Sequence, residues 1–247
     1  RVLFRSLSAL FTSLVCFSNP ATKISDNSPS SGIVIRWNDC EQTIDGFGIA
    51  QAGWAKELFA FKNRKQVMDK MFGNDGLRLN ILRGEIFPHY WENKEDKDFN
   101  LNDDINIELC DSDFNNKSDD LLRRGQLWLT LEAKNKYHIN KLVFSTWSAP
   151  AWMKSNGKVS NGKLKPECYQ DFANYLAAFY KAYKSKGITP YAISPSNEPG
   201  YAAPWNSSLW TADEMGKFIT SNLGPTFQKE NIPAKIIFGE NPLWSVV

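Results

Sequence analysis

The chain has 247 residues, and its hydrophobic content of 42% with nine tryptophans favours a globular protein with a sizeable core. A net charge of +2 gives no basic field of the kind that nucleic-acid-binding proteins carry, so no nucleic acid partner is expected. Acidic residues gather in Glu92–Asp120, which we interpret as a solvated loop. Four scattered cysteines and two histidines permit one disulfide, require none, and predict no metal site.

The amino-terminal residues are typical of part of a secretory signal peptide. The segment VLFRSLSALFTSLVCFS joins basic residues to an apolar run that is too short and too serine-rich for a membrane span. We interpret residues 1–21 as this signal and the Ser/Asn/Pro-rich residues 22–32 as a linker. The prediction is a secreted protein without stable membrane insertion, and the alternative is a disordered amino-terminal tail.

Strand and helix patterns alternate from residue 33 onward. IVIRW, within residues 33–42, predicts a short strand outside the main repeat, and QTIDGFGIA predicts a strand that ends in glycines. Apolar residues at helical spacing predict one helix over Trp54–Met71, with Gly73 as its C-terminal cap. GLRLNILRGEIFP predicts the next strand, and a helix follows over Gly125–Tyr137.

The second half continues the alternation. KLVFSTWSAPAWMKSNG predicts a strand that runs into a loop, and Pro166 opens a helix that Gly187 ends. ITPYAISPSNEPG predicts a buried strand, and KIIFGEN, Lys235–Asn241, predicts a fifth strand. Between them a helix is expected over Thr211–Asn222, where Glu214 completes a capping box.

Five β/α repeats, with strand starts near residues 43, 76, 141, 188 and 235, predict an α/β fold with a parallel sheet. Polar and aromatic residues crowd the carboxyl ends of the strands, which favours a (β/α)8 TIM barrel over an open doubly wound sheet. Eight units need about 250 residues. We therefore expect residues 43–247 to be an incomplete barrel of about five units, truncated at the carboxyl end.

Glu198 is the candidate catalytic residue. It follows a predicted buried strand, where a carboxylate is costly unless it is used or paired. Pro199 removes a backbone donor and ends the strand, so the side chain should project at the rim. Asn197 can donate and accept hydrogen bonds, which suits a sugar hydroxyl. The structural alternative is a glutamate paired with a neighbouring strand.

Other side chains near strand ends are candidates for substrate binding. Trp147, Tyr201 and Trp205, together with Trp152, offer aromatic faces on which a sugar ring can stack. Arg83 ends the second predicted strand, and its planar guanidinium can hold an acidic partner in place. The alternatives are core aromatic residues and an ion pair inside the barrel.

DGFGIAQAG, LRLNILRGE, FSTWSAPAWMKSNG and ISPSNEP, in this order, resemble glycoside hydrolase family 30, which holds endo-xylanases, endo-β-1,6-glucanases, galactanases and glucosylceramidases. The resemblance covers roughly residues 33–241. It implies a (β/α)8 barrel with a side β-sandwich, to which IVIRW contributes, and a retaining mechanism without cofactor or metal. It matches Glu198 to the acid/base, Asn197 to its neighbour, Trp147 to a sugar-lining tryptophan and Arg83 to the second-strand arginine.

The resemblance places the nucleophile on a glutamate at the end of a seventh strand, which this chain is not expected to reach. Glu240 also ends a strand, but only one strand along from Glu198, whereas a retaining pair faces across the barrel at ~5–5.5 Å. We expect Glu240 to be a wall or structural residue and the 247-residue chain alone to be inactive.

The sequence thus predicts a secreted retaining β-glycosidase acting on a poly- or oligosaccharide, with xylan ahead of β-1,6-linked glucan or galactan. A glucosylceramidase-type enzyme and a carbohydrate-binding protein without catalysis are the alternatives.

Overall fold

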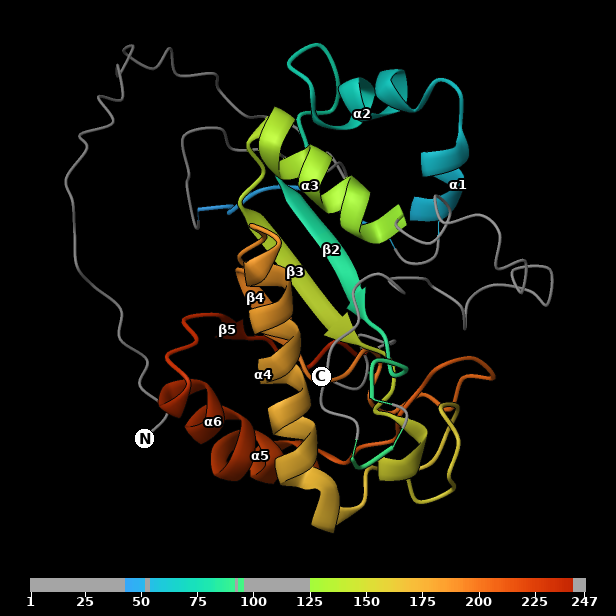
Figure 1. Cartoon of the computed structure of the whole chain (residues 1–247), viewed down its shortest axis with the longest axis vertical. Coiled ribbons are helices and arrows are strands. Elements are labelled where there is room, and N and C mark those ends of the chain that lie inside the picture. The colour runs from blue at the N-terminus through green and yellow to red at the C-terminus, as the bar shows by residue number, and fades with distance from the viewer. Residues whose placement is uncertain (1–42, 52–53, 92, 96–124, 242–247) are drawn as a thin grey trace, which may run out of the picture. The chain divides into compact units, whose positions relative to one another are not determined.

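The computed structural model describes residues 43–51, 54–91, 93–95 and 125–241 (Figure 1). The predicted signal peptide, the linker, the IVIRW strand and the acidic stretch apart from residues 93–95 lie outside the described residues. The domain boundaries proposed for them therefore stay predictions. All elements below belong to the structural unit that begins at Gly46.

Within the described residues, five strands form one parallel sheet in the order β1-β2-β3-β4-β5. The strands are β1 (Gly48–Ala50), β2 (Ile81–Ile86), β3 (Lys141–Thr146), β4 (Ala192–Ser194) and β5 (Lys235–Ile236). A barrel places consecutive strands side by side, whereas a doubly wound sheet reverses its strand order part-way. The predicted partial α/β barrel is confirmed, and the doubly wound alternative is wrong.

Helices connect the strands. They are α1 (Ala55–Ala60), α2 (Arg64–Phe72), α3 (Gly125–Tyr137), α4 (Tyr169–Ser185), α5 (Ala212–Phe218) and α6 (Gly224–Lys229), with short 3-10 turns η5 (Ala151–Met153) and η6 (Pro166–Cys168) and a π turn η7 (Ile219–Leu223). The helix predicted over Gly125–Tyr137 is confirmed at both ends. Pro166 opens η6, which leads directly into α4, because its fixed φ suits the first position of a helix.

The single helix predicted over Trp54–Met71 is wrong, because α1 and α2 are separate. Phe61 takes an extended backbone conformation, with φ −72° and ψ 127°. Arg64 stabilises the break, since its side chain donates to Phe59 O at 2.5 Å and lies 4.8 Å from the centroid of the Phe59 ring. Both helices contribute to one buried core, which explains why the apolar spacing continues across the break.

The capping box of α5 is confirmed, but its predicted end at Asn222 is wrong. Thr211 Oγ1 accepts from Glu214 N at 3.2 Å, and Glu214 Oε2 accepts from Thr211 N at 2.7 Å. The helical path then continues through η7 into α6 and ends at Lys229. The proline in the first turn of α6 needs no intrahelical donor there, so it does not end the path.

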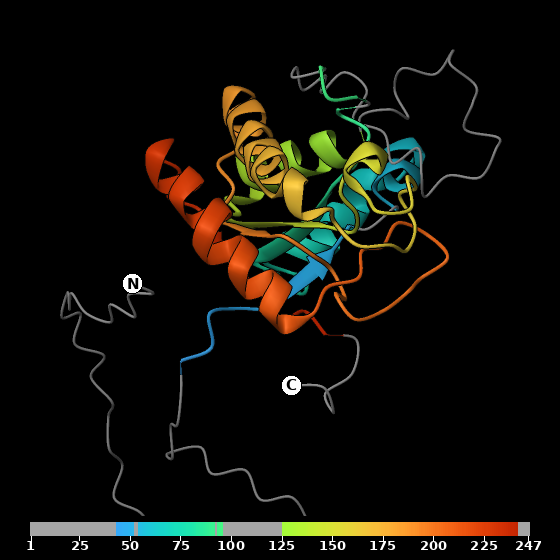
Figure 2. The ribbon, with the colours of Figure 1, turned by 90° about the horizontal axis from the view of Figure 1, so that it is seen from below.

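Apolar residues cover the helix side of the sheet. Figure 2 shows α3 and α4 lying along one side of the strands. Phe144 of β3 packs edge-on against two rings of α4, at 5.1 Å from Phe179 and 4.9 Å from Tyr183. Leu82 and Ile193 lie on the same side of their strands and are equally buried. This side of the sheet forms the core between strands and helices.

The opposite side of the sheet is polar. Side chains alternate along a strand, so Arg83 and Glu85 of β2 point away from the helices, and the register places Ser145 beside Glu85 and Ser194 beside Ser145. In a barrel this side faces the interior. The strands therefore supply a row of polar groups to the inside of the fold.

Gly84 allows α3 to approach β2 closely. A Cβ at this position would lie 2.7 Å from the Phe144 ring and 2.9 Å from Gln126 Oε1. The Gln126 side chain uses the space to accept from Glu85 N and to donate to Glu85 O, both at 2.8 Å. These bonds fix the end of β2 against α3.

Candidate functional site

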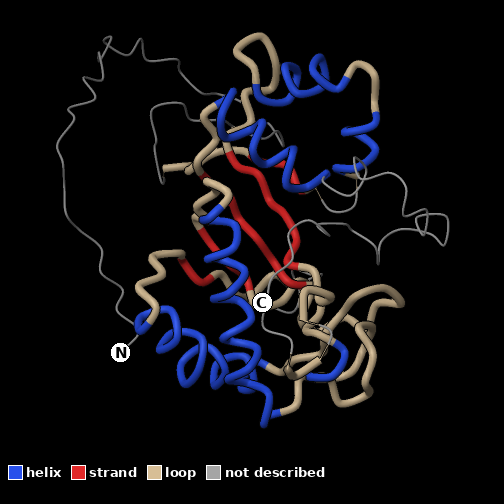
Figure 3. Tube along the Cα trace, in the orientation of Figure 1, coloured by secondary structure: helices blue, strands red, loops and turns tan. Residues whose placement is uncertain are grey.

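Loops gather at the end of the sheet to which β2 and β3 point (Figures 1 and 3). The five strands of the described residues are parallel, so their carboxyl ends meet there, at the edge where barrel enzymes place their active sites. Trp147, Asn197, Glu198, Tyr201 and Trp205 follow β3 or β4 at this end. Arg83 lies within β2, three residues before its end, and reaches the same end through its side chain.

Glu198 lies beyond the strand rather than at its tip. The prediction that the buried strand runs to Glu198 is wrong, because β4 ends at Ser194. The following backbone stays bound on both sides: Asn197 N donates to Thr146 O at 2.6 Å, and Glu198 N donates to Glu240 O at 3.0 Å. Thr146 ends β3 and Glu240 follows β5, so the neighbouring strands fix the position of Glu198.

The backbone of Glu198 is left-handed, with φ +44°. Residues other than glycine rarely adopt this conformation, which costs of order 1–3 kcal/mol and clusters at functional sites. Tyr201 N donates to Glu198 O at 2.9 Å and closes the turn. The Glu198 side chain is partly exposed. The fold thus presents a carboxyl group at the rim on a tightly bound turn.

Arg83 connects β2 to the segments after β4 and β5. Its Nη2 donates to Asn197 Oδ1 at 2.8 Å, its Nε donates to Glu240 Oε1 at 3.1 Å, and Nη2 also reaches Glu240 Oε2 at 3.3 Å. The acidic partner expected for the guanidinium is therefore Glu240. Because Asn197 directly precedes Glu198, this network holds the residue beside the candidate acid.

Glu240 is held by three residues. Its Oε2 also accepts from Ser145 Oγ at 2.6 Å and from Ser194 Oγ at 2.8 Å. The Glu240 side chain is only 21% exposed. A carboxylate whose oxygens accept from a guanidinium and two hydroxyls is well compensated for burial. This geometry is that of a structural residue that joins β2, β3, β4 and the segment after β5.

Trp147 contacts Arg83. The Arg83 Cζ lies 4.6 Å from the centroid of the Trp147 ring, which is a cation–π distance. Trp147 is buried, with 8% of its surface exposed, and the guanidinium lies over its ring. The sugar-lining role of Trp147 stays a prediction.

Tyr201 and Trp205 form the exposed aromatic part of the site. They are 44% and 45% exposed, and their ring centroids are 6.3 Å apart with planes inclined by 59°. Both belong to the loop that begins with the Glu198 turn. Large aromatic rings that stay exposed in such a loop suit stacking against a sugar.

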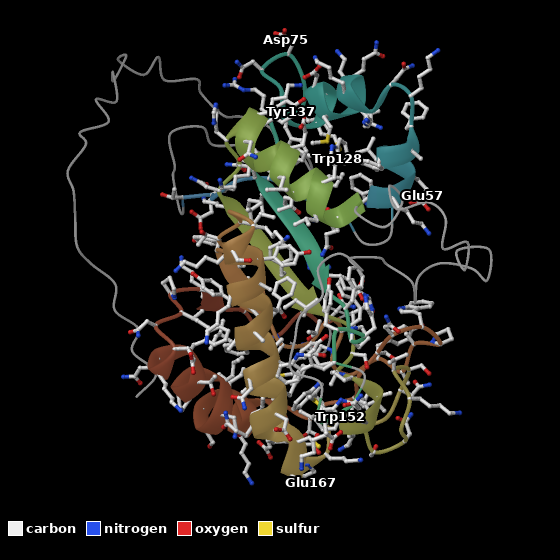
Figure 4. The ribbon with its side chains drawn as sticks, viewed as in Figure 1. Glu57, Asp75, Trp128, Tyr137, Trp152 and Glu167 are labelled. Carbon is white, nitrogen blue, oxygen red and sulfur yellow. The ribbon has the colours of Figure 1, made fainter. Side chains whose placement is uncertain are left out.

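Trp152 contacts the segment that follows β2. Figure 4 shows it beside the amino-terminal part of α4. Its Nε1 donates to Trp91 O at 3.1 Å, and both tryptophans line a cavity of about 230 Å³ that also includes Asp171 and Asn174 of α4. Trp152 therefore packs with the outer helix layer.

Three polar residues of the site were missed by sequence reasoning. Ser145 and Ser194 hold Glu240, and Glu85 is a fully buried carboxyl group on the same side of the sheet. The alternation of Arg83 and Glu85 in LRGE was the available signal, since both must face the barrel interior. No local pattern marks the two serines, because their role depends on a partner elsewhere in the chain.

The described residues contain no group of three or more His, Cys, Asp or Glu side chains that could hold a metal ion. None of the helices in the described ranges is long and apolar enough to cross a membrane.

A family model described as the glycosyl hydrolase family 30 TIM-barrel domain matches residues 44–238. The chain belongs to this family. Among curated relatives, the putative glucosylceramidase 3 of Caenorhabditis elegans is 30% identical over 200 residues, which cover 77% of this chain and 37% of the relative. The endo-1,6-beta-D-glucanase of Neurospora crassa is 29% identical over 213 residues, covering 79% of this chain and 42% of the relative.

Solved structures of family 30 proteins show the same fold. The catalytic domain of GH30 xylanase C from Talaromyces cellulolyticus superposes with a TM-score of 0.67 at 25% identity, covering 83% of this chain and 48% of that chain. A further curated relative, matched by sequence over a shorter stretch, is the glucuronoxylanase XynC of Bacillus subtilis, which is 34% identical over 114 residues, covering 44% of this chain and 25% of the relative. The chain spans less than half the length of these relatives. Family 30 proteins are glycoside hydrolases, so the chain forms part of a glycoside hydrolase TIM-barrel domain.

Proposed function

We propose that the protein carrying this chain is a retaining β-glycosidase in which Glu198 is the acid/base. The placement of Glu198 carries the proposal. It is a partly exposed carboxyl group on a left-handed turn past the end of β4, in a chain of glycosyl hydrolase family 30. Glycosidases use paired carboxyl groups, one of which protonates the leaving oxygen.

The reaction proceeds in two displacements. In the first, the Glu198 carboxylic acid gives its proton to the glycosidic oxygen while a carboxylate attacks the anomeric carbon, so the leaving alcohol departs and a covalent glycosyl ester forms. In the second, the Glu198 carboxylate takes a proton from water, which attacks the anomeric carbon and releases the nucleophile. Two inversions at one carbon give net retention.

The nucleophile, in this proposal, lies outside the described residues. Glu240 follows β5, the direct neighbour of β4, whereas the two carboxyl groups of a retaining pair face each other across the barrel, so we assign Glu240 a structural role. Arg83 instead acts as a positioning residue, since it bonds Asn197 and Glu240 on either side of the Glu198 turn.

The substrate we propose is a polysaccharide, with xylan ahead of β-1,6-linked glucan or galactan. The exposed rings of Tyr201 and Trp205 support an extended sugar chain, because they offer stacking surfaces past the carboxyl group. Relatives named as glucosylceramidases support glucosylceramide as the second candidate. Secretion is proposed because residues 1–21 are typical of a signal peptide.

Product analysis tests the proposal. The protein, at the length at which its source makes it, is incubated with xylan, β-1,6-glucan, β-galactan and glucosylceramide, and anomeric protons are followed by NMR from the first minutes. The expected first product is the β-anomer. An α-anomer formed first would contradict retention, and sugar binding without any hydrolysis would support the non-catalytic carbohydrate-binding alternative.

A further inference from the structure

A fully buried lysine joins two loops at the carboxyl end of the sheet. Lys154 lies in the β3 loop (residues 147–165), and 0% of its surface is exposed. Its Nζ donates to Ser148 Oγ at 3.1 Å within that loop and to Ser207 O at 2.7 Å in the β4 loop (residues 195–211). The second bond connects the loop after β3 to the loop that follows Glu198.

Ser207 is the point where the two loops meet. Its N–H donates to Val159 O at 3.0 Å, and its Oγ accepts from Asn161 N at 2.9 Å. Two residues later, Leu209 N donates to Gly162 O at 2.9 Å. Neutral groups make these three contacts, whereas the Lys154 ammonium makes a charge-assisted bond that is about twice as strong as a neutral one.

The same serine also fixes the aromatic part of the β4 loop. Ser207 Oγ donates to Ala203 O at 3.0 Å and lies 3.2 Å from Trp205 O. A shift of Ser207 would therefore move Trp205 and, through the ring contact at 6.3 Å, the environment of Tyr201. Lys154 is therefore linked to the exposed rings through one intermediate residue, Ser207.

Burial of the Lys154 ammonium carries a desolvation cost. Within the described residues its hydrogen-bond partners are a hydroxyl and a carbonyl, and no carboxylate pairs with it. Burial lowers the pKa of Lys154 to about 8. A buried apolar side chain would avoid this desolvation, so the bond to Ser207 is best explained by the position that it sets.

We propose that Lys154 is a positioning residue for substrate binding, which fixes Ser207 and thereby holds Tyr201 and Trp205 in the loop that follows Glu198. The inference rests on the proposed function, because it takes these rings to be the sugar-binding wall. It adds that the β3 loop determines the shape of the wall formed by the β4 loop.

Hydrogen exchange tests the loop contact without relying on catalysis. Lys154→Met removes the ammonium and keeps the length of the side chain, and Lys158→Met is the matched control because Lys158 is an exposed lysine of the same loop. We expect amide exchange at Ser207 and Leu209 to become about tenfold faster in Lys154→Met, as for a loss near 1.4 kcal/mol, and to be unchanged in Lys158→Met. Exchange within α4 should not change in either variant.

Kinetics and binding test the positioning role. Using xylohexaose and a β-1,6-linked glucohexaose as probes, we expect Lys154→Met to raise KM and the dissociation constant about tenfold for the hexasaccharide that the wild-type protein uses. The kcat for a nitrophenyl monosaccharide, which does not extend along the wall, should stay within twofold. Ser148→Ala removes only one of the two acceptors and should give an intermediate rise in KM.

The outcomes separate this inference from the proposed function. Unchanged exchange at Ser207, or unchanged hexasaccharide affinity in a folded Lys154→Met protein, would overturn the positioning role. If Lys154→Met fails to fold, Ser148→Ala takes its place, and an unchanged KM there would overturn the role as well. A wild-type protein that neither binds nor cleaves either hexasaccharide would refute xylan and β-1,6-glucan as substrates and with them the role at the wall, while the exchange data alone would still decide whether Lys154 joins the loops.

Discussion

Replacing Arg83 by lysine should lower the free energy of unfolding by about 2 kcal/mol. The guanidinium makes three hydrogen bonds at once, two to Glu240 and one to Asn197, and it lies over Trp147. A lysine keeps the charge but has a single nitrogen, which can reach one of these acceptors well. Two charge-assisted bonds and the stacked plane are therefore lost.

The magnitude follows from the exposure of the pair. A hydrogen bond to a charged group contributes about 1.5–3 kcal/mol when it is well buried. The side chains of Arg83 and Glu240 are 22% and 21% exposed, so water compensates part of each loss. Taking about 1 kcal/mol for each of two bonds gives about 2 kcal/mol, with screening already discounted.

Urea unfolding followed by tryptophan fluorescence measures this change. With an m-value of about 2 kcal/mol/M, the midpoint of Arg83→Lys should fall by about 1 M. Arg78→Lys is the matched control, because Arg78 is exposed and a surface substitution should stay within about 0.5 kcal/mol. If the two variants unfold at the same urea concentration, the Arg83 network does not hold the strands together as described. The same substitution should also lower kcat/KM, since Asn197 loses its anchor beside Glu198.

Three further predictions concern stability. The folded pKa of Lys154 is about 8 and its ordinary value is 10.5, so between these values the unfolded chain binds more protons and stability rises with pH. Urea titrations from pH 8 to 10.5 should show this rise, about 3 kcal/mol in total, in the wild type relative to Lys154→Met; parallel curves for the two proteins would contradict a buried ammonium. Thr211→Ala should destabilise the protein by about 1 kcal/mol through loss of the α5 cap, whereas Thr189→Ala, at an exposed loop position, should not. The Lys163 ammonium and the Thr211 N–H lower the pKa of Glu214, so the stabilisation that ionised Glu214 provides should be lost as the pH falls through that lowered pKa. If the free energy of unfolding falls equally with pH in the wild type and in Glu214→Gln, this expectation is wrong.

The repeating pattern of the fold could be predicted from the sequence because its signals are local. The helix over Gly125–Tyr137 has apolar residues at the right spacing, and the capping box of Thr211 and Glu214 lies within one turn. The break between α1 and α2 was missed because both helices face one core and the apolar spacing gives no sign of the extended Phe61. The predicted helix end at Asn222 was also wrong, because a π turn lets the helical path continue past this residue.

The candidate site was only partly predictable, because its geometry depends on contacts between distant segments. Glu198 could be singled out from the tripeptide with Asn197 and Pro199, but its left-handed turn depends on bonds to β3 and to the segment after β5. Arg83 and Glu240 are 157 positions apart, and no local sequence pattern near either residue indicates that the two side chains pair. The burial of Lys154 likewise follows from two loops meeting, which no periodicity encodes.

The central claim is that Glu198 is the acid/base, and the leaving-group dependence of Glu198→Gln tests it most directly. The variant is compared with the wild-type protein, at its natural length, on two glycosides of the same sugar, one with an activated nitrophenyl group and one with an alkyl group. Only the alkyl group needs a proton to depart, so we expect kcat/KM for it to fall at least 100-fold further than for the nitrophenyl glycoside, since acid catalysis contributes about 10²–10⁴. Equal losses on both substrates would contradict the role of Glu198 as the acid.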